Sequence, residues 1–204
     1  MIMNKKMKIV AILAALVLVI GVAAGSTLAW LTDKTEAVTN TFTKGDVDIT
    51  LIETMEPDGT VVAGGVTDWS APLIPGKDYS KNPTITVEST TNADCWLFVK
   101  FEEVNNASTY LSYTSTLTDA NGWTQGNGTE IPDNVWYRKV KTDDTIKSWE
   151  LLDGNKITVK GDTVTKDSMN EAANAKLIYT GYAIQTVKFD TASDAWTEIS
   201  NPTP

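Results

Sequence analysis

The residues after position 41 are dominated by Thr, Val, Ile, Tyr and Trp, with turn-forming residues at intervals of eight to fifteen positions. This pattern predicts an all-β chain, because β-branched and aromatic residues favour strands while Gly, Pro, Asn and Asp interrupt them. Within 42–53, Val47, Ile49 and Leu51 fall on one face, and Asp46 and Asp48 fall on the other. We therefore expect a half-buried strand there, with both carboxylates in solvent.

Two further segments are predicted to be strands buried on both faces. The first is Cys95–Val104, where an apolar run extends from Cys95 to Val99. The second is 177–189, with Leu177, Tyr179, Ala183, Val187 and Phe189 on one face and Ile178, Tyr182 and Ile184 on the other. The other expected strands are 79–87, 110–117, 135–140, 149–152 and 156–159, the last two joined by a tight hairpin turn at Asp153-Gly154-Asn155.

Turns, loops and two short helices complete the expected domain. Turns are predicted at Pro57-Asp58-Gly59 and Pro75-Gly76, a further break at Gly64-Gly65, a loop at 90–94 and an exposed loop at 121–128. Residues 167–175 are rich in Ala, Glu and Met and predict a helix, and 191–199 predicts a short capped helix whose Trp196 packs back. The expected fold of residues 42–204 is a two-sheet, jelly-roll-type β-sandwich.

The first 29 residues are predicted to form a helical secretory signal peptide. Lys5, Lys6 and Lys8 precede the uncharged stretch 9–31, which ends in small residues such as Gly25, Ser26 and Ala29. We expect cleavage after Ala29, so that the mature chain begins at Trp30 and 30–41 is an N-terminal extended segment. The alternative is an uncleaved anchor, because these 23 uncharged residues are long enough to span a bilayer core. The leader is the only membrane contact that we expect.

The charge balance excludes nucleic acid as a partner. Removing residues 1–29 takes away three lysines, so 17 basic residues become 14 against 26 acidic ones, a net charge of −12. Arg138 is the only arginine, and no basic cluster follows the leader. Binding a polyanion requires clustered Lys and Arg, which this chain lacks.

The chain contains no histidine, which excludes Ser-His-Asp and Cys-His catalysis and the common His-ligated metal centres. The single cysteine, Cys95, lies in an apolar segment and is expected to be a buried thiol rather than a nucleophile. Glu102 and Glu103 are adjacent in a strand and should point to opposite faces. Asp46, Asp48 and Asp143-Asp144 are interpreted as solvated carboxylates, since no calcium-loop spacing is present. We expect no catalytic residue, no metal site and no cofactor, and therefore no enzyme.

The join between the leader and the first strand carries a motif. It runs Ser26-Thr27-Leu28-Ala29-Trp30-Leu31-Thr32-Asp33, and later Phe42-Thr43-Lys44-Gly45-Asp46-Val47. A second motif is Leu73-Ile74-Pro75-Gly76-Lys77-Asp78, followed by Asn92-Ala93-Asp94. Both resemble the TasA/camelysin family, with its Gly/Thr-rich leader end, aromatic residues near the cleavage site, a nearby acid, an F-x-x-G-x-h strand entry and an L-x-PG-D turn. The resemblance covers roughly residues 1–104.

This resemblance implies a jelly-roll protein that is cleaved by the signal peptidase SipW and exported to the surface or biofilm matrix of a Gram-positive bacterium. TasA builds fibres in which the N-terminal strand of one subunit completes a sheet of the next. Carried over, 30–40 would be the donor strand, anchored by Trp30, Leu31, Val38 and Phe42, and the partner would be another copy or a related matrix protein. The metalloprotease role described for camelysin does not carry over, because no histidine is present to support it.

Two alternatives stay open beside this expectation. Residues 30–40 can instead form a first strand within their own domain, or remain a free terminus. The whole protein can instead be a monomeric surface module that binds carbohydrate or a host ligand through exposed aromatic rings. Trp69, Trp123 and Trp136 are the candidates for that role, since they lie in or beside loop-like stretches.

Overall fold

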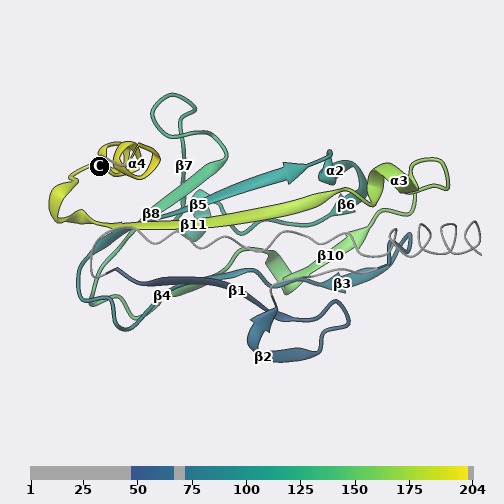
Figure 1. Ribbon diagram of the computed structural model, residues 1–204, viewed down its shortest axis with the longest axis horizontal. Helices are drawn as coiled ribbons and strands as arrows, with labels where there is room; N and C mark the ends of the chain where they lie inside the picture. Colours follow the sequence, from purple (N-terminus) through teal and green to yellow (C-terminus); the bar gives the residue numbers. More distant parts are fainter. Residues whose placement is uncertain (1–46, 67–71, 202–204) are drawn as a thin grey trace, which may run out of the picture. The chain divides into compact units, whose positions relative to one another are not determined.

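Antiparallel β-strands make up most of the regular structure. A computed structural model describes residues 47–66 and 72–201 (Figure 1). Every pairing between the described strands is antiparallel, and the helices are few and short, so the predicted all-β fold is confirmed. The leader and the segment 30–41 lie outside the described residues.

The strands of the described residues form three hydrogen-bonded sheets. The first has the order β2-β1-β4-β9, from β1 (Ile49–Met55), β2 (Val61–Val66), β4 (Thr84–Val87) and β9 (Ser148–Glu150). The second has the order β3-β10-β6, from β3 (Asp78–Ser80), β10 (Lys156–Val159) and β6 (Leu111–Ser112). The third has the order β11-β5-β8-β7, from β11 (Lys176–Gln185), β5 (Cys95–Val104), β8 (Val135–Val140) and β7 (Thr124–Gln125). The described helices are α2 (Ala107–Tyr110), α3 (Met169–Ala172) and α4 (Ala192–Ser200), with 3-10 turns at Asp119–Asn121, Asp153–Asn155 and Thr186–Lys188.

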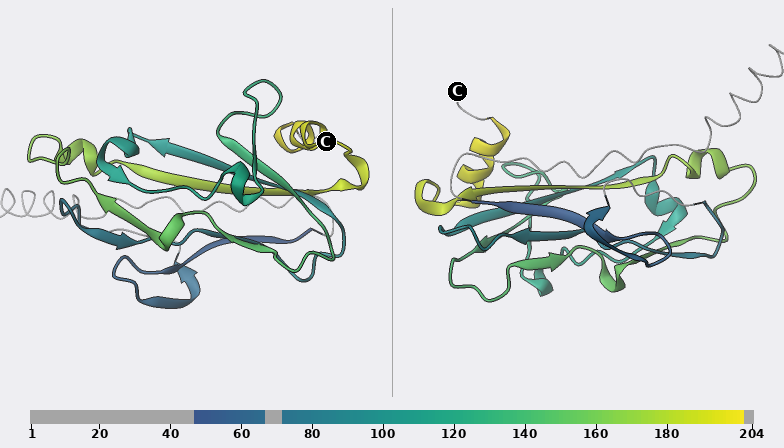
Figure 2. Two further views of the ribbon diagram at one scale, coloured as in Figure 1. Left: turned by 180° about the vertical axis from the view of Figure 1, so that it is seen from behind. Right: turned by 60° about the horizontal axis from the view of Figure 1, so that its bottom comes forward.

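The main core lies between two layers of strands. Figures 1 and 2 show β11, β5 and β8 in one layer and β1, β4, β3 and β10 in the other. One buried cluster joins Ile49 and Ile85 of the second layer to Leu97, Val99 and Tyr179 of the first. Burial of these large apolar side chains supplies most of the driving force for folding.

A second core covers the outer face of the β11-β5-β8-β7 sheet. Phe98, on the face of β5 opposite Leu97 and Val99, packs with its ring centre 5.3 Å from that of Trp196 in α4. The Thr191 hydroxyl accepts the Asp194 N–H at 3.1 Å and so caps this helix. Both the two-sided burial of β5 and the capped C-terminal helix were predicted correctly.

Several other predictions are also confirmed. Strands β5 and β8 have the expected bounds. In the first strand Val47, Ile49 and Leu51 are buried and Asp48 is exposed, while Asp46 lies outside the described residues. Turns form at Pro57-Asp58-Gly59 and Pro75-Gly76, and 90–94 contains no strand or helix.

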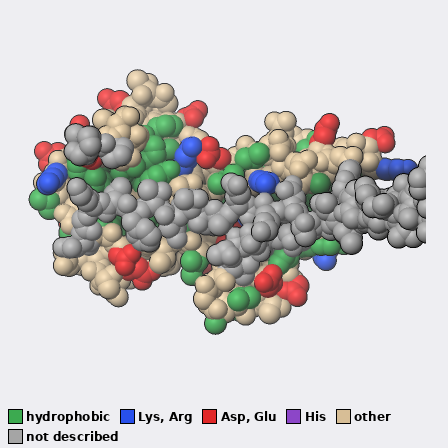
Figure 3. All heavy atoms as spheres, viewed as in Figure 1, with side chains coloured by type: hydrophobic (Ala, Val, Ile, Leu, Met, Phe, Trp, Pro, Cys, Tyr) green, Lys and Arg blue, Asp and Glu red, His purple; other side chains and the backbone are tan. Residues whose placement is uncertain are grey.

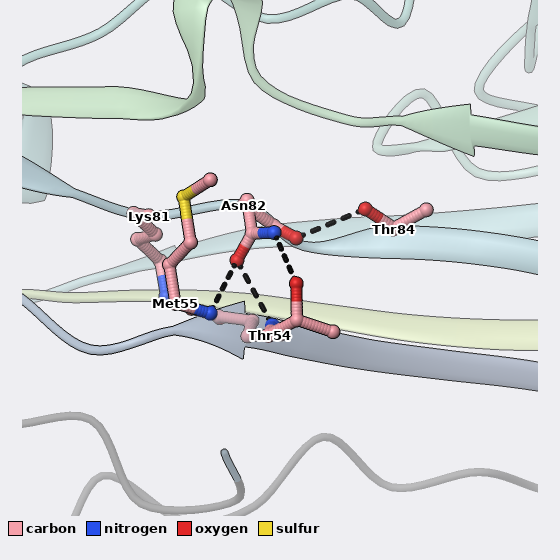
Figure 4. A network of polar contacts seen from close by, with 6 residues as sticks. Thr54, Met55, Lys81, Asn82 and Thr84 are labelled. Atoms are coloured by element: carbon pink, nitrogen blue, oxygen red, sulfur yellow. Dashed lines mark hydrogen bonds and ion pairs between the residues drawn. The ribbon is translucent and has the colours of Figure 1, made fainter. Parts of the chain in front are cut away.

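The predicted strand 79–87 is wrong, because two short strands of different sheets take its place. Between β3 and β4, the Asn82 side chain hydrogen-bonds to β1 (Figure 4). Its Oδ1 accepts the N–H groups of Thr54 and Met55, both at 3.0 Å, and its Nδ2 donates to Thr54 Oγ1 at 2.8 Å. The next residue, Pro83, has no N–H to donate to a ladder. The chain therefore leaves one sheet and enters the other here.

The predicted hairpin at Asp153-Gly154-Asn155 is also wrong. Strand β9 pairs with β4, whereas β10 pairs with β3 and β6. The turn does use positive φ, 64° at Gly154 and 51° at Asn155, but it connects two sheets instead of two paired strands. The predicted interruption at Gly64-Gly65 is wrong as well, because both glycines lie within β2, where the pairing with β1 is irregular.

Four smaller corrections concern the middle and the end of the chain. The predicted strand 110–117 is mostly irregular, with only β6 in a strand, and the helix within 167–175 is limited to α3. The stretch 121–128 is not wholly exposed, because Trp123 is only 2% exposed. Strand β11 ends at Gln185, so Val187 follows in a 3-10 turn and is 80% exposed rather than buried.

Candidate functional site: the outer edge of β11

Strand β11 ends the order of its sheet and is ten residues long, which makes it the longest strand at a sheet end in the described part of the chain. On one side β5 pairs with it along its full length, from Lys176 opposite Val104 to Gln185 opposite Cys95. We call its other side the β11 outer edge. A long strand at a sheet end is a natural template for a further strand.

Thr186, the residue just beyond β11, shows which residues of the strand hydrogen-bond to β5. We call this alternation the hydrogen-bond phase of β11. The Thr186 N–H donates to the Asp94 carbonyl at 2.9 Å, so the even-numbered residues of β11 form the hydrogen-bonded pairs with β5. On the other side of β5, the Phe101 N–H donates to the Asn134 carbonyl at 2.9 Å, which fits the same alternation. The N–H and C=O groups of odd-numbered residues are therefore directed to the outer edge, at intervals of about 7 Å from Leu177 to Tyr179 and from Tyr179 to Gly181.

The same odd-numbered residues face the core between the layers. Tyr179 is 1% exposed. A Cβ atom at Gly181 would lie 2.8 Å from Ile85 Cδ1 and 3.5 Å from Ile49 Cδ1, so the two layers meet closely at this glycine. A segment added beyond β11 would place every second side chain toward this core.

Charge at the β11 outer edge differs from the rest of this acidic chain. Apart from its tyrosines, β11 has one ionisable side chain, that of Lys176 at its start. The strand contains no Asp or Glu. An approaching segment that carries Asp33 and Glu36 therefore meets no carboxylate within the strand itself. Like charges directly opposite each other across strands would oppose pairing.

The residues predicted for cleavage and strand donation, Ala29, Trp30, Leu31, Val38 and Phe42, lie outside the described residues. The same holds for Trp69. Trp123 is buried, so its ring does not offer the open face that stacking on a sugar requires, whereas Trp136 is half-buried against the main core.

The thiol and the carboxylate pair are arranged as predicted. Cys95 is fully buried, and burial raises the pKa of its thiol to about 12. Glu102 pairs with Lys100 at 2.9 Å, whereas Glu103 accepts hydrogen bonds from the Ser108 N–H and the Tyr113 hydroxyl. Although burial acts in the opposite direction, these hydrogen bonds lower the pKa of Glu103. The two carboxylates thus have separate partners and do not form an acid/base pair.

Within residues 47–66 and 72–201, no group of three or more Asp, Glu or Cys side chains could hold a metal ion. In Figure 3 the acidic side chains are spread over the visible face rather than gathered at one place. Among the same residues no helix has the length and apolar character needed to cross a bilayer.

An arginine between two tryptophans was missed by the sequence analysis. The Arg138 guanidinium lies 4.3 Å from the ring centre of Trp149 and 5.1 Å from that of Trp123, and the two rings are 6.0 Å apart. Burial lowers the pKa of Arg138, while the charge of Asp144 opposes this shift. Because Arg138 belongs to β8 and Trp149 to β9, this cluster ties the two layers together.

A buried ion pair was missed as well. Lys81 Nζ lies 2.6 Å from Glu53 Oε1, and the two residues are 8% and 4% exposed. The signal was present in β1, because Glu53 continues the alternating face of Ile49 and Leu51. A carboxylate on that face needs a buried cation or hydrogen-bond donors.

Neither a known protein family, nor a curated protein, nor a solved structure matches this chain.

Proposed function

We propose that this chain is a secreted, non-enzymatic structural protein of an extracellular or cell-surface fibre or layer, assembled by β-strand addition. An extended segment of one copy, residues 30–40, would dock on the β11 outer edge of the next. The observation that carries the proposal is the length and hydrogen-bond phase of β11, which directs a row of backbone groups away from β5.

The proposed overall architecture is a jelly-roll-type β-sandwich. Its support is the arrangement of the β2-β1-β4-β9 and β11-β5-β8-β7 sheets in two layers around one apolar cluster. In such a fold, a strand added at β11 would lie over the inner face that already contains Ile49 and Tyr179.

The energetics of strand addition favour this role. A donor satisfies backbone groups at the sheet edge and buries alternate side chains, as in other β-augmentation complexes. Full burial of a Val or Phe side chain, such as those of Val38 and Phe42, contributes about 1.5–3 kcal/mol each. Export is supported by the basic and apolar leader, and the matrix location by the resemblance of its cleavage region to TasA/camelysin proteins.

The first test removes the donor. Mature protein that lacks residues 30–40 should remain folded but should not polymerise, as measured by sedimentation velocity and electron microscopy. The 30–40 peptide should then raise the melting temperature as its concentration rises, because a ligand of the folded state stabilises it by mass action. A peptide with Val38 replaced by Asp is the matched control. Fibres formed by the truncated protein would disprove the donor role.

The second test concerns the acceptor edge. Gln185 has φ −60°, which suits proline, and its N–H points to the outer edge, so Gln185→Pro removes one edge donor while leaving the β5 ladder intact. It should weaken assembly relative to Gln185→Ala, which keeps the N–H. If both variants assemble equally well, the β11 outer edge is not the surface that accepts the donor strand. A full-length mature protein that stays monomeric at high concentration and across pH would favour the monomeric surface module.

A further inference from the structure

Four residues place polar groups between the layers: Glu53 of β1, Lys81 just after β3, Asn155 just before β10, and Tyr179 of β11. The Glu53–Lys81 ion pair described above is the centre of this cluster, with 2.6 Å between Lys81 Nζ and Glu53 Oε1. Tyr179 lies close enough to Glu53 that, after burial and the neighbouring Tyr113, the Glu53 carboxylate helps to raise the Tyr179 pKa. Each of these side chains comes from a different part of the chain.

The register of β3 and β10 places Lys81 opposite Asn155. Tyr79 pairs with Ile157 and Ser80 with Lys156, so the next pair along the ladder is Lys81 with Asn155. The Lys81 N–H donates to the Asn155 carbonyl at 2.9 Å, which confirms that the pairing extends to them. Tyr79 and Ile157 are buried, and side chains two residues along a strand share a face. Lys81 therefore belongs to the inward face and is 8% exposed. Asn155 ends a 3-10 turn with φ 51°, so strand alternation does not fix its direction, but its Oδ1 is buried.

Three atoms of this cluster have no hydrogen-bond partner although they are buried: Glu53 Oε2, Asn155 Oδ1 and Tyr179 OH. In the described ranges Arg138 Nε is the only other buried side-chain atom of this kind. Buried polar atoms are almost always hydrogen-bonded, so the two such atoms on Glu53 and Asn155, which are linked through Lys81 by an ion pair and a backbone hydrogen bond, point to chemistry that uses them.

We propose that Lys81 and Asn155 become joined by an intramolecular isopeptide bond whose formation is promoted by Glu53. The three side chains needed for this reaction are the amine of Lys81 just after β3, the carboxamide of Asn155 just before β10 and the carboxyl group of Glu53 in β1. The proposal is independent of strand addition at β11, and either can fail without the other.

The reaction balances without any further reactant. Glu53 takes one proton from the Lys81 ammonium, which turns two buried charges into neutral groups and removes their desolvation cost. The neutral Lys81 Nζ then attacks Asn155 Cγ, while the protonated Glu53 donates a hydrogen bond to Asn155 Oδ1, where negative charge develops. The C–N bond to Nδ2 breaks and the Nζ–Cγ amide forms. The Nδ2 group leaves as ammonia, taking the second proton of the amine by way of Glu53.

An isopeptide bond would give this chain a covalent cross-link that its cysteine content cannot provide. Cys95 is the only cysteine, so an intrachain disulfide cannot form. A bond between positions 81 and 155 would close a loop that spans 155 − 81 = 74 positions and would restrict the unfolded chain as a disulfide does.

The test is the intact mass of the denatured protein. The wild-type chain should be lighter than its sequence mass by one ammonia, and tandem mass spectrometry should find a peptide that links Lys81 to Asn155. Asn155→Ala is the principal variant, because it keeps the Glu53–Lys81 pair and removes the carboxamide; the φ of 51° at this position strains alanine, so folding of the variant is checked as well. It should have its full sequence mass, as should Lys81→Met and Glu53→Gln. Lys156→Met, which removes the neighbouring exposed lysine that pairs with Asp78, should still lose ammonia.

Succinimide formation also releases ammonia, and Asn121-Gly122 and Asn127-Gly128 are sequences prone to it. Hydroxylamine cleaves a succinimide but leaves an isopeptide bond intact, so the mass deficit should survive this treatment. Wild-type protein at its full sequence mass would overturn the proposal. So would a deficit that persists in folded Asn155→Ala protein, with folding checked by circular dichroism.

Discussion

The backbone of Gly126 lies so close to Pro132 that a Cβ atom at position 126 would fall 2.0 Å from the Pro132 carbonyl oxygen. It would also lie 2.6 Å from the Ile131 carbonyl oxygen. The loop folds back on itself here, because the Gly126 N–H donates to the Val135 carbonyl and the Gly128 N–H to the Ile131 carbonyl. This conformation brings Ile131 into the cluster beneath α4.

Gly126→Ala should therefore destabilise the protein by about 1–3 kcal/mol, since backbone atoms rather than a flexible side chain must move. Chemical denaturation measures the effect. Gly161→Ala is the matched control, because its Cβ would lie 3.7 Å from the nearest atom, Gly76 N. That variant should change the free energy of unfolding by no more than about 0.5 kcal/mol. Equal stability of the two variants would contradict the close contact at Gly126.

Arg138 should stabilise the protein through its cation–π contact with Trp149. Arg138→Lys keeps the charge but loses the flat guanidinium, so we expect a loss of about 1 kcal/mol. A double-mutant cycle with Trp149→Phe measures the pairwise interaction, for which we expect a coupling of about 0.5–2 kcal/mol. Additive effects of the two substitutions would show that the 4.3 Å approach contributes no net stability.

The strands that could be predicted are those whose signal is contained within the strand itself. The apolar run at Cys95–Val99 gives β5, and the alternation of Val47, Ile49 and Leu51 gives β1. Both signals reflect burial, which depends on the side chains of one segment.

Strand partners could not be predicted in the same way. The residues Asp153-Gly154-Asn155 do indicate positive φ, and the structure has it, but φ does not determine which strands pair. The pairings of β9 with β4 and of β10 with β3 depend on contacts between segments far apart in the sequence. The split of 79–87 has the same origin, since it depends on the hydrogen bonds of Asn82 to β1.

Contacts between distant segments are hardest to predict for the polar groups of the interior. The alternation of β1 places Glu53 on the inner face, but nothing in its neighbourhood identifies Lys81, 28 positions away, as its partner. Similarly, the polar residues around Trp123 predict exposure, whereas Arg138 and Trp149 of other strands cover its ring.

We predict that export is followed by cleavage after Ala29, because small residues before the cut suit a signal peptidase. The secreted protein should then begin at Trp30, which intact mass and N-terminal sequencing would both detect. Ala29→Lys should reduce processing, while Ser70→Lys, a change far from the cleavage region in the sequence, should leave it unaffected. Secreted or surface protein that still contains 5–24 would favour the uncleaved anchor.

The buried thiol of Cys95 should make the protein less stable as the pH rises in the alkaline range. Burial, assisted by the charge of Asp94, raises the pKa of the thiol from its ordinary 9.0 to about 12 in the folded state. Between these two values the unfolded chain loses the thiol proton while the folded chain keeps it, so the unfolded state binds fewer protons and stability falls as pH rises. The expected contribution is about 1.4 kcal/mol per pH unit in this window, and it is absent below it.

Cys95→Ala removes the titrating group and is the matched variant for this prediction. At neutral pH it should be less stable than the wild type, because it leaves a small cavity in β5. As pH rises above 9.0, the wild type should lose stability faster, so the difference between the two proteins should shrink. Cys95→Ser should lose stability at neutral pH as well, since its hydroxyl would be buried without an assured partner. Denaturant unfolding at a series of pH values measures all three proteins. A constant difference between wild type and Cys95→Ala across this range would mean that the thiol ionises without unfolding and is not buried as the structure shows.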